Sequence, residues 1–532
     1  AYTYDSTGNI TEIKDPAGIS TRYEYDLLGR ITCIHSGQGM KVQYGYDSLD
    51  RIEHIHYGNG VQTNYAYDCD GNISHLETRT ESAVLLSFDY KYDGNGNRTA
   101  KTGIQGLTAG SSALDIRYQY DVRGQLLEEC QNGAAVRYAY DTAGNRIQKT
   151  KDEKETRYRY NQKNQLLQKE DADGISCFTY DRQGGIIEEK TAAGNRRFTY
   201  NSLHQQTQVE TETGSIQKNR YDAEGLRYEL IENGRRTSFV YHNGELLHEK
   251  GEEAGLSKEA TSYHLGAGIE AFQRDRKTFY YHQDEQLNTA LISDEKAAIR
   301  NHYQYDAFGA GLEAIEALPN RIRYTGQQYD EQTEQYYLRA RYYNPVLGRF
   351  MQEDVYQGDG LNLYAYCHNN PVVYYDPSGY VTVNLSADCG QNGKLGNEQE
   401  EYVAPKPFRE DMSPEDIKMY DYFWKSKIDL TQIGPFAGDS IPAQSKSQKF
   451  STEERVKINA IGRNTGCHSC GTTDPGTKSG NFIPDHQPVS NTVPDGTPQV
   501  LYPQCRQCSL AQGGMIRARA SKKEAKEKKK GG

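Results

Sequence analysis

Residues Tyr138–Ile147 read Tyr-Ala-Tyr-Asp-Thr-Ala-Gly-Asn-Arg-Ile, and close variants of this stretch recur along most of the chain. The Tyr-x-Tyr alternation is typical of a half-buried strand. The Asp starts a turn, the Gly allows a positive φ, and the Ile begins the next strand. Each unit is therefore predicted to be a β-hairpin. Because one hairpin cannot bury its own face, neighbouring units must stack.

The repeat is regular in two blocks of the sequence. Tyr-Asp recurs every 21 residues from Tyr4 to Tyr67, and Tyr-Asp or Tyr-Asn recurs every 20 or 21 residues from Tyr120 to Tyr221. The 43 Tyr and 51 Gly, with a hydrophobic content of only 35%, favour an all-β repeat. We expect its strands to bury tyrosine rings and expose their hydroxyls. The Asp starts the turn in each unit, which favours a structural role over cation or sugar binding.

These units are similar to the tyrosine–aspartate repeats of the Rhs/YD-repeat family, and the resemblance covers roughly residues 1–380. Residues 321–380, which include Asp376-Pro377-Ser378-Gly379, resemble the signature segment that closes the family's shell. The resemblance implies a mainly β fold. Spiralling hairpins of residues 1–320 would form a hollow shell, and residues 321–380 would close it.

The closing segment contains two aspartates of interest. In related shells two aspartates at this place form an aspartic-protease-like pair that cuts the chain just after the Asp-Pro-x-Gly element, and the matching positions are Asp354 and Asp376. Two close carboxylates share a proton and so provide one acid and one base. Asp354 is followed by Val355, where the cleaving pattern usually has Pro. Self-cleavage and simple turn formation are the two roles left open.

Beyond the repeats, residues 381–445 are predicted to be a linker with a short helix, and residues 446–532 a separate domain. Ser451–Glu454 has the form of a capping box and predicts a helix start. Cys467-His468-Ser469-Cys470 and Cys505-Arg506-Gln507-Cys508 can supply four thiolates to a tetrahedral zinc ion. Such a closed site is structural, and His468 is interpreted as a spacer.

Asp485-His486-Gln487-Pro488, between the cysteine pairs, resembles the Asp-His-x-x-Pro strand of zinc-containing HNH (His-Me finger) nucleases. The resemblance implies a small α+β domain of the ββα type, in which His486 is the general base. Asp485 would help to hold a catalytic Mg²⁺ or another divalent cation. The position after the second cysteine pair, usually Asn or His in that family, is Ser509, which is a further candidate ligand.

Two other interpretations of this domain can be weighed from the sequence. Asp485 and His486 can instead form a turn against the zinc site. A zinc nucleobase deaminase needs a Glu as proton shuttle, and no Glu lies between Cys467 and Cys508, which excludes that class.

Charge is unevenly distributed. Residues 446–532 contain 15 Lys and Arg against 7 Asp and Glu, whereas the rest contains 47 against 66. A basic domain on an acidic carrier indicates a nucleic-acid-binding payload, although the lysine-rich end can also be only a solvated tail. The predicted phosphate contacts are Arg506, Arg517, Arg519 and Lys522. No run approaches the roughly 20 apolar residues of a membrane span.

The sequence thus predicts the C-terminal portion of a polymorphic toxin. Its shell, secreted or on the cell surface, would deliver a metal-dependent nuclease into the cytoplasm of a target cell, with DNA, or alternatively RNA, as substrate. The resemblance implies a cognate immunity protein and a secretion machinery as partners. Two alternatives remain: a non-catalytic zinc module that binds nucleic acid or protein, and a cell-surface adhesion protein whose repeats bind carbohydrate.

Overall fold

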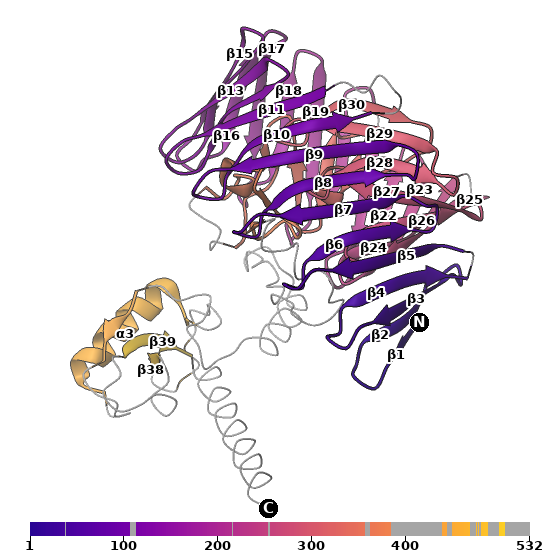
Figure 1. The fold of residues 1–532 in the computed structure, drawn as a ribbon. Coiled ribbons are helices and arrows are strands. Elements are labelled where there is room, and N and C mark those ends of the chain that lie inside the picture. The colour runs from indigo at the N-terminus through magenta and orange to yellow at the C-terminus, as the bar shows by residue number, and fades with distance from the viewer. Residues whose placement is uncertain are drawn as a thin grey trace, which may run out of the picture. The chain divides into compact units, whose positions relative to one another are not determined.

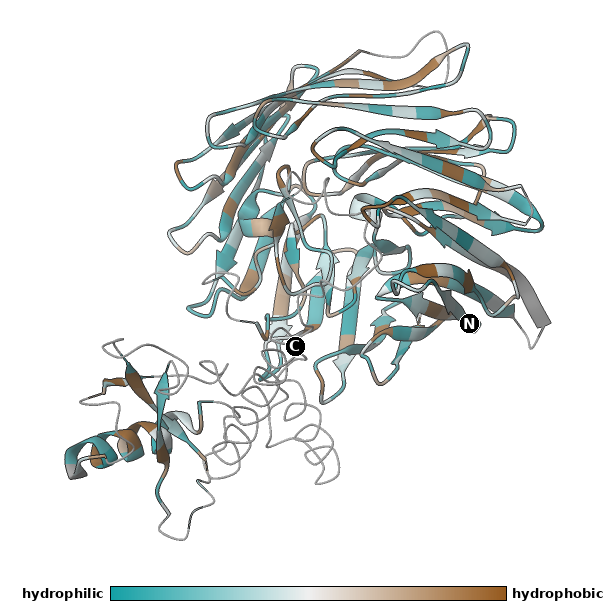
Figure 2. Cartoon of the chain, turned by 60° about the horizontal axis from the view of Figure 1, so that its bottom comes forward, coloured by the Kyte–Doolittle hydropathy of each residue, from teal (hydrophilic) through white to brown (hydrophobic). Residues whose placement is uncertain are grey.

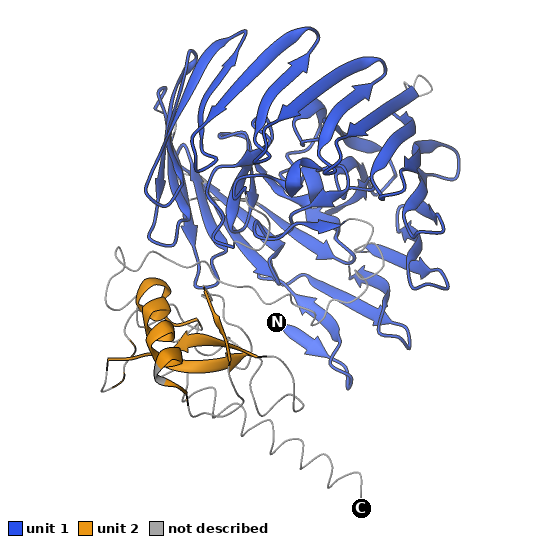
Figure 3. Cartoon of the chain, turned by 90° about the vertical axis from the view of Figure 1, so that its left-hand side faces the viewer, with its two compact units in different colours: residues 1–408 blue, residues 409–532 orange. Residues whose placement is uncertain are grey.

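Two compact units divide the chain, residues 1–408 and 409–532 (Figure 3). The computed structural model describes residues 1–37, 39–106, 113–214, 216–253, 256–356, 362–384, 439–443, 450–468, 475, 477, 480–487 and 499–505. Strand β37 (Ile441–Pro442) pairs antiparallel with β39 (Val500–Gln504) of the second unit. Next to this pairing, the Ala443 N–H donates to the Gln499 carbonyl over 3.0 Å. That unit therefore begins upstream of the predicted start at residue 446.

Thirty antiparallel strands form one curved sheet in the first unit, and each strand pairs with the next one along the chain (Figure 1). Hydrophobic and hydrophilic residues alternate along many of these strands (Figure 2). This confirms the predicted shell of stacked hairpins. The strands are β1 (Tyr2–Tyr4), β2 (Ile10–Lys14), β3 (Ser20–Tyr25), β4 (Ile31–Ser36), β5 (Lys41–Tyr46), β6 (Ile52–Tyr57), β7 (Gln62–Tyr67), β8 (Ile73–Arg79), β9 (Val84–Tyr92), β10 (Arg98–Gln105), β11 (Ala113–Tyr120), β12 (Leu126–Gln131), β13 (Ala134–Tyr140), β14 (Arg146–Lys151), β15 (Lys154–Tyr160), β16 (Leu166–Asp171), β17 (Gly174–Tyr180), β18 (Ile186–Thr191), β19 (Gly194–Tyr200), β20 (Gln206–Thr211), β21 (Ile216–Tyr221), β22 (Arg227–Glu232), β23 (Arg235–His242), β24 (Glu245–Glu253), β25 (Leu256–Leu265), β26 (Ile269–Arg274), β27 (Lys277–Gln283), β28 (Thr289–Asp294), β29 (Ile299–Tyr305) and β30 (Gly311–Glu316).

The turn aspartate of each repeat caps backbone groups of its own turn. In the repeat quoted first, Asp141 Oδ1 accepts the N–H groups of Ala143 and Asn145 over 2.9 and 2.8 Å. Gly144 has a φ of 76°, which a residue with a Cβ rarely adopts. The same carboxylate bonds recur at Asp26, Asp47, Asp121 and Asp222. These bonds are consistent with the predicted structural role of the turn aspartates.

The repeat tyrosines behave differently from the prediction. The Tyr140 hydroxyl donates to the Leu126 carbonyl over 2.9 Å, and the hydroxyls of Tyr25, Tyr46 and Tyr67 reach the preceding hairpin in the same way. The expectation that these hydroxyls are exposed was wrong, because each one satisfies a carbonyl 14 or 15 residues earlier. These bonds connect neighbouring hairpins beyond the backbone ladder.

The closing segment packs against strands of the sheet through buried aromatic and charged side chains. Arg227 of β22 and Asp330 are both fully buried and form an ion pair. Tyr337 and Tyr342 pack in one cluster with Phe178 of the shell. The elements of this segment are η1 (Tyr324–Gly326), β31 (Gln328–Asp330), β32 (Gln335–Leu338), β33 (Arg341–Asn344), β34 (Arg349–Phe350), η2 (Cys367–Asn369), β35 (Tyr374–Tyr375) and β36 (Val383–Asn384).

The second unit contains helix α3 (Thr452–Thr465) and strands β37, β38 (Ile483–Gln487) and β39 (Val500–Gln504). Ser451 caps the helix, and its hydroxyl and the Glu454 side chain make both bonds of the predicted capping box. Strand β39 pairs antiparallel with both β37 and β38, and the ββα unit stays a prediction. The expected helix after Cys508 and the expected helix start at Ser413 lie outside the described residues. No helix in the described ranges is long and apolar enough to cross a membrane.

Candidate functional site

The first candidate site lies where the shell ends. Strands β35 and β36 form a small hairpin, with Tyr375 opposite Val383, and the turn between them contains Asp376-Pro377-Ser378-Gly379. Gly379 has a φ of 78°, and a Cβ there would lie 2.5 Å from the Leu338 carbonyl oxygen. Only glycine fits this close approach of the turn to the closing segment.

The two aspartates of the closing segment meet at one guanidinium group. Arg341 Nη2 lies 2.8 Å from Asp354 Oδ2 and 3.4 Å from Asp376 Oδ2. Asp354 is 6% exposed, Asp376 is fully buried, and Arg341 is 4% exposed. The other guanidinium nitrogens donate to the carbonyls of Gly379 and Leu363. Two carboxylates 22 positions apart in sequence thus contact the same buried guanidinium group.

The same carboxylates also make turn contacts. Asp376 Oδ1 accepts the N–H groups of Ser378 and Gly379 over 3.1 and 2.7 Å, and Asp354 Oδ1 accepts that of Tyr356 over 2.7 Å. The second oxygen of each carboxylate points to Arg341. The turn role and the paired role therefore coexist in one arrangement. Sequence reasoning missed Arg341, whose only signal was its position in the signature segment.

The second candidate site is the hairpin of the C-terminal unit. Helix α3 contacts both β38 and β39. The Phe482 ring packs directly against Gly462 of the helix, since a Cβ on that glycine would lie only 2.4 Å from a ring carbon. The buried cluster under the helix consists of Ile458, Cys467, Phe482, Leu501 and Cys505. Cys467 follows the helix and Cys505 follows β39, so the fold brings the first cysteine of each predicted pair into one small core.

Asp485 contacts a residue that the sequence interpretation left as a spacer. His468 is fully buried, and its Nε2 lies 2.9 Å from Asp485 Oδ2. The His468 N–H donates to the Pro503 carbonyl over 2.8 Å, and its ring packs 5.5 Å from that of Tyr502. His468 thus has a carboxylate partner, so it does more than separate the two cysteines of the pair. Gln487 Nε2 also donates to Asp485 Oδ2, over 2.6 Å.

His486 is 5% exposed and its ring centroid lies 5.2 Å from that of Phe450. Consecutive side chains of a strand point to opposite faces, which agrees with the separate neighbours of Asp485 and His486. Cys470, Cys508 and Ser509, and the predicted phosphate contacts Arg506, Arg517, Arg519 and Lys522, lie outside the described residues. Within those residues no group of three or more His, Cys, Asp or Glu is placed to hold a metal ion.

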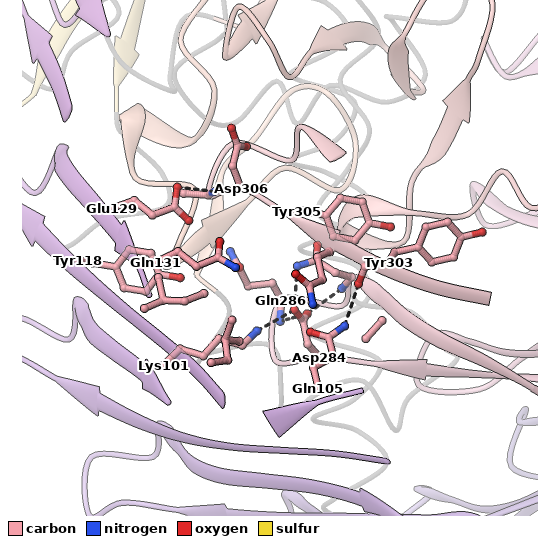
Figure 4. Close-up of a pocket in the computed structure, with 16 residues that line it drawn as sticks. Lys101, Gln105, Tyr118, Glu129, Gln131, Asp284, Gln286, Tyr303, Tyr305 and Asp306 are labelled. Atoms are coloured by element: carbon pink, nitrogen blue, oxygen red, sulfur yellow. Dashed lines mark hydrogen bonds and ion pairs between the residues drawn. The ribbon is translucent and has the colours of Figure 1, made fainter. Parts of the chain in front are cut away.

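A third feature is a polar pocket inside the shell, between strands β10–β12 and the region of β28 and β29 (Figure 4). Lys101 Nζ lies 3.0 Å from Asp284 Oδ2 on one side of it. On the other side Glu129 Oε2 accepts the Ala307 N–H over 3.1 Å, next to Asp306. Burial, and secondarily the nearby Asp306 carboxylate, raises the pKa of Glu129 to about 8.

A sheet of consecutive antiparallel hairpins, with Tyr-Asp turns and an aromatic closing segment, defines a shell protein built from tyrosine–aspartate repeats. The chain belongs to the Teneurin YD-shell family, whose model matches residues 1–93 and 81–372. This confirms the resemblance drawn from the repeats.

Known proteins are similar to part of this chain. The tRNA3(Ser)-specific nuclease WapA of Bacillus spizizenii is 37% identical over 171 residues, which are 30% of this chain and 7% of that protein. The toxin protein Tse5 of Pseudomonas aeruginosa is 35% identical over 103 residues, 19% of this chain and 8% of that protein. The chain therefore spans less than a tenth of the length of these relatives.

A solved structure of TcdB2-TccC3-Cdc42 resembles the fold, with a TM-score of 0.62 at 20% identity. The match covers 74% of this chain and 22% of that chain. It supports the shell architecture alone.

Proposed function

We propose that this chain is the C-terminal part of a polymorphic toxin, in which the shell carries the second unit as a payload and cuts the connection to it. The convergence of Asp354 and Asp376 on Arg341, beside the turn that ends at Gly379, carries this proposal. The names of WapA and Tse5 support it, since both are described as a nuclease or a toxin.

The proposed cleavage uses the two carboxyl groups in different protonation states. One carboxylate takes a proton from water, whose oxygen attacks the carbonyl carbon of a peptide bond just after Gly379. The other, protonated, carboxyl group gives its proton to the leaving nitrogen as the C–N bond breaks. The products are a carboxylate and an amine. Arg341 holds the carboxylates together, because its positive charge offsets their mutual repulsion.

Intact-mass analysis of the purified full chain tests this step. We expect two polypeptides whose boundary lies just after Gly379, and a single chain for Asp376→Asn and for Asp354→Asn. Asp173→Asn, at an exposed turn of the shell, is the matched control and should cleave like the parent. A parent chain that stays whole, or Asn variants that still cleave, would leave the two aspartates with their turn contacts only.

For the payload we propose a zinc-containing, metal-dependent nuclease. Cys467, Cys470, Cys505 and Cys508 would hold the structural zinc, and the burial of Cys467 and Cys505 in one core fits this ligand set. His486 would take the proton of the attacking water, and Asp485 with Ser509 would help to hold Mg²⁺. A bound divalent cation would stabilise charge at the scissile phosphate. His468 would position Asp485 through their 2.9 Å contact.

Incubation of the full chain with plasmid DNA or with tRNA in the presence of Mg²⁺ tests the nuclease. We expect cleavage of one substrate and a loss of at least about 100-fold in His486→Ala. Glu453→Gln, on the exposed face of α3, should cleave like the parent. Binding of nucleic acid without cleavage would favour the non-catalytic zinc module, and equal rates in His486→Ala would remove His486 as the base.

The remaining parts of the proposal concern the cellular setting. The payload would act in the cytoplasm of a target cell after secretion, and a cognate immunity protein would mask it in the producer. Deleting residues 385–532 distinguishes the adhesion alternative. Loss of toxicity to target cells is expected, whereas unchanged toxicity or cell binding as the only activity would favour repeats that act as the adhesive part.

A further inference from the structure

The N-terminal hairpins of the shell meet its later strands across a seam, defined here as the contacts between residues 10–67 and residues 245–294 (Figure 1). Strands of the sheet pair only with their neighbours in sequence, and no backbone–backbone hydrogen bond crosses the seam in the part of the chain that the structure describes. Side chains therefore hold it. One apolar cluster spans both sides and includes Ile13, Val42 and Phe272.

His264 of β25 lies within the seam. It is fully buried, and its Nδ1 lies 2.7 Å from the hydroxyl oxygen of Thr21 on β3. Two residues earlier, Ser262 donates a hydrogen bond to the Asp15 carboxylate at the turn after β2. His248 Nδ1 lies 3.3 Å from both Ser262 Oγ and Asp15 Oδ2. The Thr21–His264 and Asp15–Ser262 contacts connect residues 243 and 247 positions apart.

His282 of β27 occupies a second position in the seam. It is also fully buried, and its Nε2 lies 2.7 Å from Ser293 Oγ. Asn59, in the turn after β6, donates to the same Ser293 oxygen over 2.8 Å, and the Tyr57 ring meets the imidazole edge-on at 4.8 Å. The second ring nitrogen, Nδ1, has no hydrogen-bond partner among the described residues.

We propose that this seam is an acid-sensitive closure of the shell, in which protonation of His264 and His282 separates the N-terminal hairpins from strands β24–β28. A proton on either ring puts a positive charge into a buried contact. The Asp15 carboxylate and the Gln273 side chain near His264 offset only part of the cost of burial, and His282 faces the Ser293 hydroxyl and the Tyr57 ring. A buried charge without a full set of partners is costly, and separation of the two sides returns the imidazoles to water. The seam lacks backbone pairing, so it opens before the strand ladders do.

The direction of the pH effect follows from the protonation equilibria. Burial lowers the pKa of His264 to about 4 and that of His282 to about 3, below the ordinary value of 6.5. The open state then binds protons more readily than the closed state. The closed seam is fully stable above pH 6.5 and loses stability as the pH falls below that value. Each histidine contributes roughly a tenfold rise in the opening equilibrium by pH 5.5, so the two together give about 100-fold.

Other titratable groups face these rings and modify the response. Burial raises the pKa of Asp15, but hydrogen bonds from His248 and Ser262 outweigh it and hold this pKa below its usual value, so Asp15 also favours opening in acid. Burial raises the pKa of Glu270, which contacts Tyr44 and Tyr57, so protonation of this carboxylate opposes opening. His248 also faces Asp15 and Ser262 in the seam. The phenols of Tyr44, Tyr57 and Tyr280 have raised pKa values that keep them neutral.

Hydroxyl-radical footprinting of side chains in the full chain at pH 7.5 and pH 5.5 tests the proposal, because the seam is held by side chains and its opening leaves the strand ladders paired. We expect reversible loss of protection from oxidation at the buried seam side chains Tyr44, Tyr57 and Phe272 at pH 5.5, with an opening equilibrium raised about 100-fold. Strands β13–β19, remote from the seam in sequence, serve as the internal reference and should change little.

Uncharged variants keep the hydroxyl contacts without the proton. Asn reproduces the Nδ1 position used by His264, and Gln the Nε2 position used by His282, so H264N/H282Q should retain protection at pH 5.5. His75→Gln, at a half-buried histidine on β8 outside the seam, should open like the parent. Full protection of the parent at pH 5.5, or opening of H264N/H282Q at the same pH as the parent, would overturn the proposal. The parent measurement alone decides the matter if the double variant does not fold.

Discussion

In the shell, each turn aspartate and each repeat tyrosine satisfies backbone groups of its own or the preceding hairpin. In the C-terminal unit, by contrast, two of the five buried core residues that the structure describes are cysteines. The shell spreads its stability over many similar local bonds, whereas the described core of the C-terminal unit contains two of the cysteines proposed to hold zinc. The two regions should therefore respond to different perturbations.

Removal of zinc is expected to give the largest contrast. A chelator, or Cys467→Ala, should unfold the second unit completely, because the metal would supply most of its folding free energy. Limited proteolysis should then digest residues beyond 408 and leave the shell intact. Cys33→Ala, at a buried cysteine of the shell, should leave the second unit resistant. A second unit that resists proteolysis without metal would break the comparison.

Breaking the buried ion pair between shell and closing segment should act on the first unit only. Arg227→Met leaves Asp330 charged and buried, which costs about 3–5 kcal/mol of unfolding free energy. Chemical denaturation of the shell measures this loss. The control is Arg117→Met, since Arg117 pairs with Asp115 on the surface and should change nothing measurable. An equal loss of unfolding free energy in the two variants would show that the Arg227–Asp330 pair does not stabilise the packing of the closing segment on the shell.

The pH dependence of the shell's unfolding free energy should also differ from that of the C-terminal unit, because of a buried carboxyl group in the shell. The pKa of Glu129 is raised to about 8, so the folded shell holds this proton more tightly than the unfolded chain. Stability from this group is fully present below its ordinary pKa of about 4.5, falls by about 1.4 kcal/mol per pH unit as the pH rises from there, and is lost once the pH has passed about 8. Thermal unfolding between pH 6 and pH 9 should show the loss, and Glu129→Gln should flatten it. The same slope in Glu129→Gln would assign the effect to another group.

Single repeats should contribute the smallest effects. Asp141→Ala removes the acceptor of two backbone N–H groups and should cost about 1–2 kcal/mol, whereas Tyr140→Phe removes one hydroxyl bond and should cost about 1 kcal/mol. Denaturant midpoints measure both. Additivity of the same changes in a distant repeat, at Tyr25 and Asp26, would confirm that stability is spread evenly. A loss several times larger at one repeat would contradict that picture.

Local patterns were predictable from the sequence, and long-range pairings were not. The Tyr-Asp turns and the Ser451 capping box depend on residues within four positions of each other, and both were predicted. The tyrosine hydroxyls were misjudged because their acceptors belong to the preceding hairpin. Arg341 and the His468–Asp485 contact were missed because no periodicity marks a pair that only the folded chain brings together.

Native mass spectrometry of the purified full chain tests the central claim most directly. The account predicts two polypeptides separated just after Gly379, of which only the C-terminal one carries zinc, in a ratio of one ion per chain. A single 60.2 kDa chain without metal would contradict the account. Neither the proposed cleavage after Gly379 nor the metal-dependent payload would then exist.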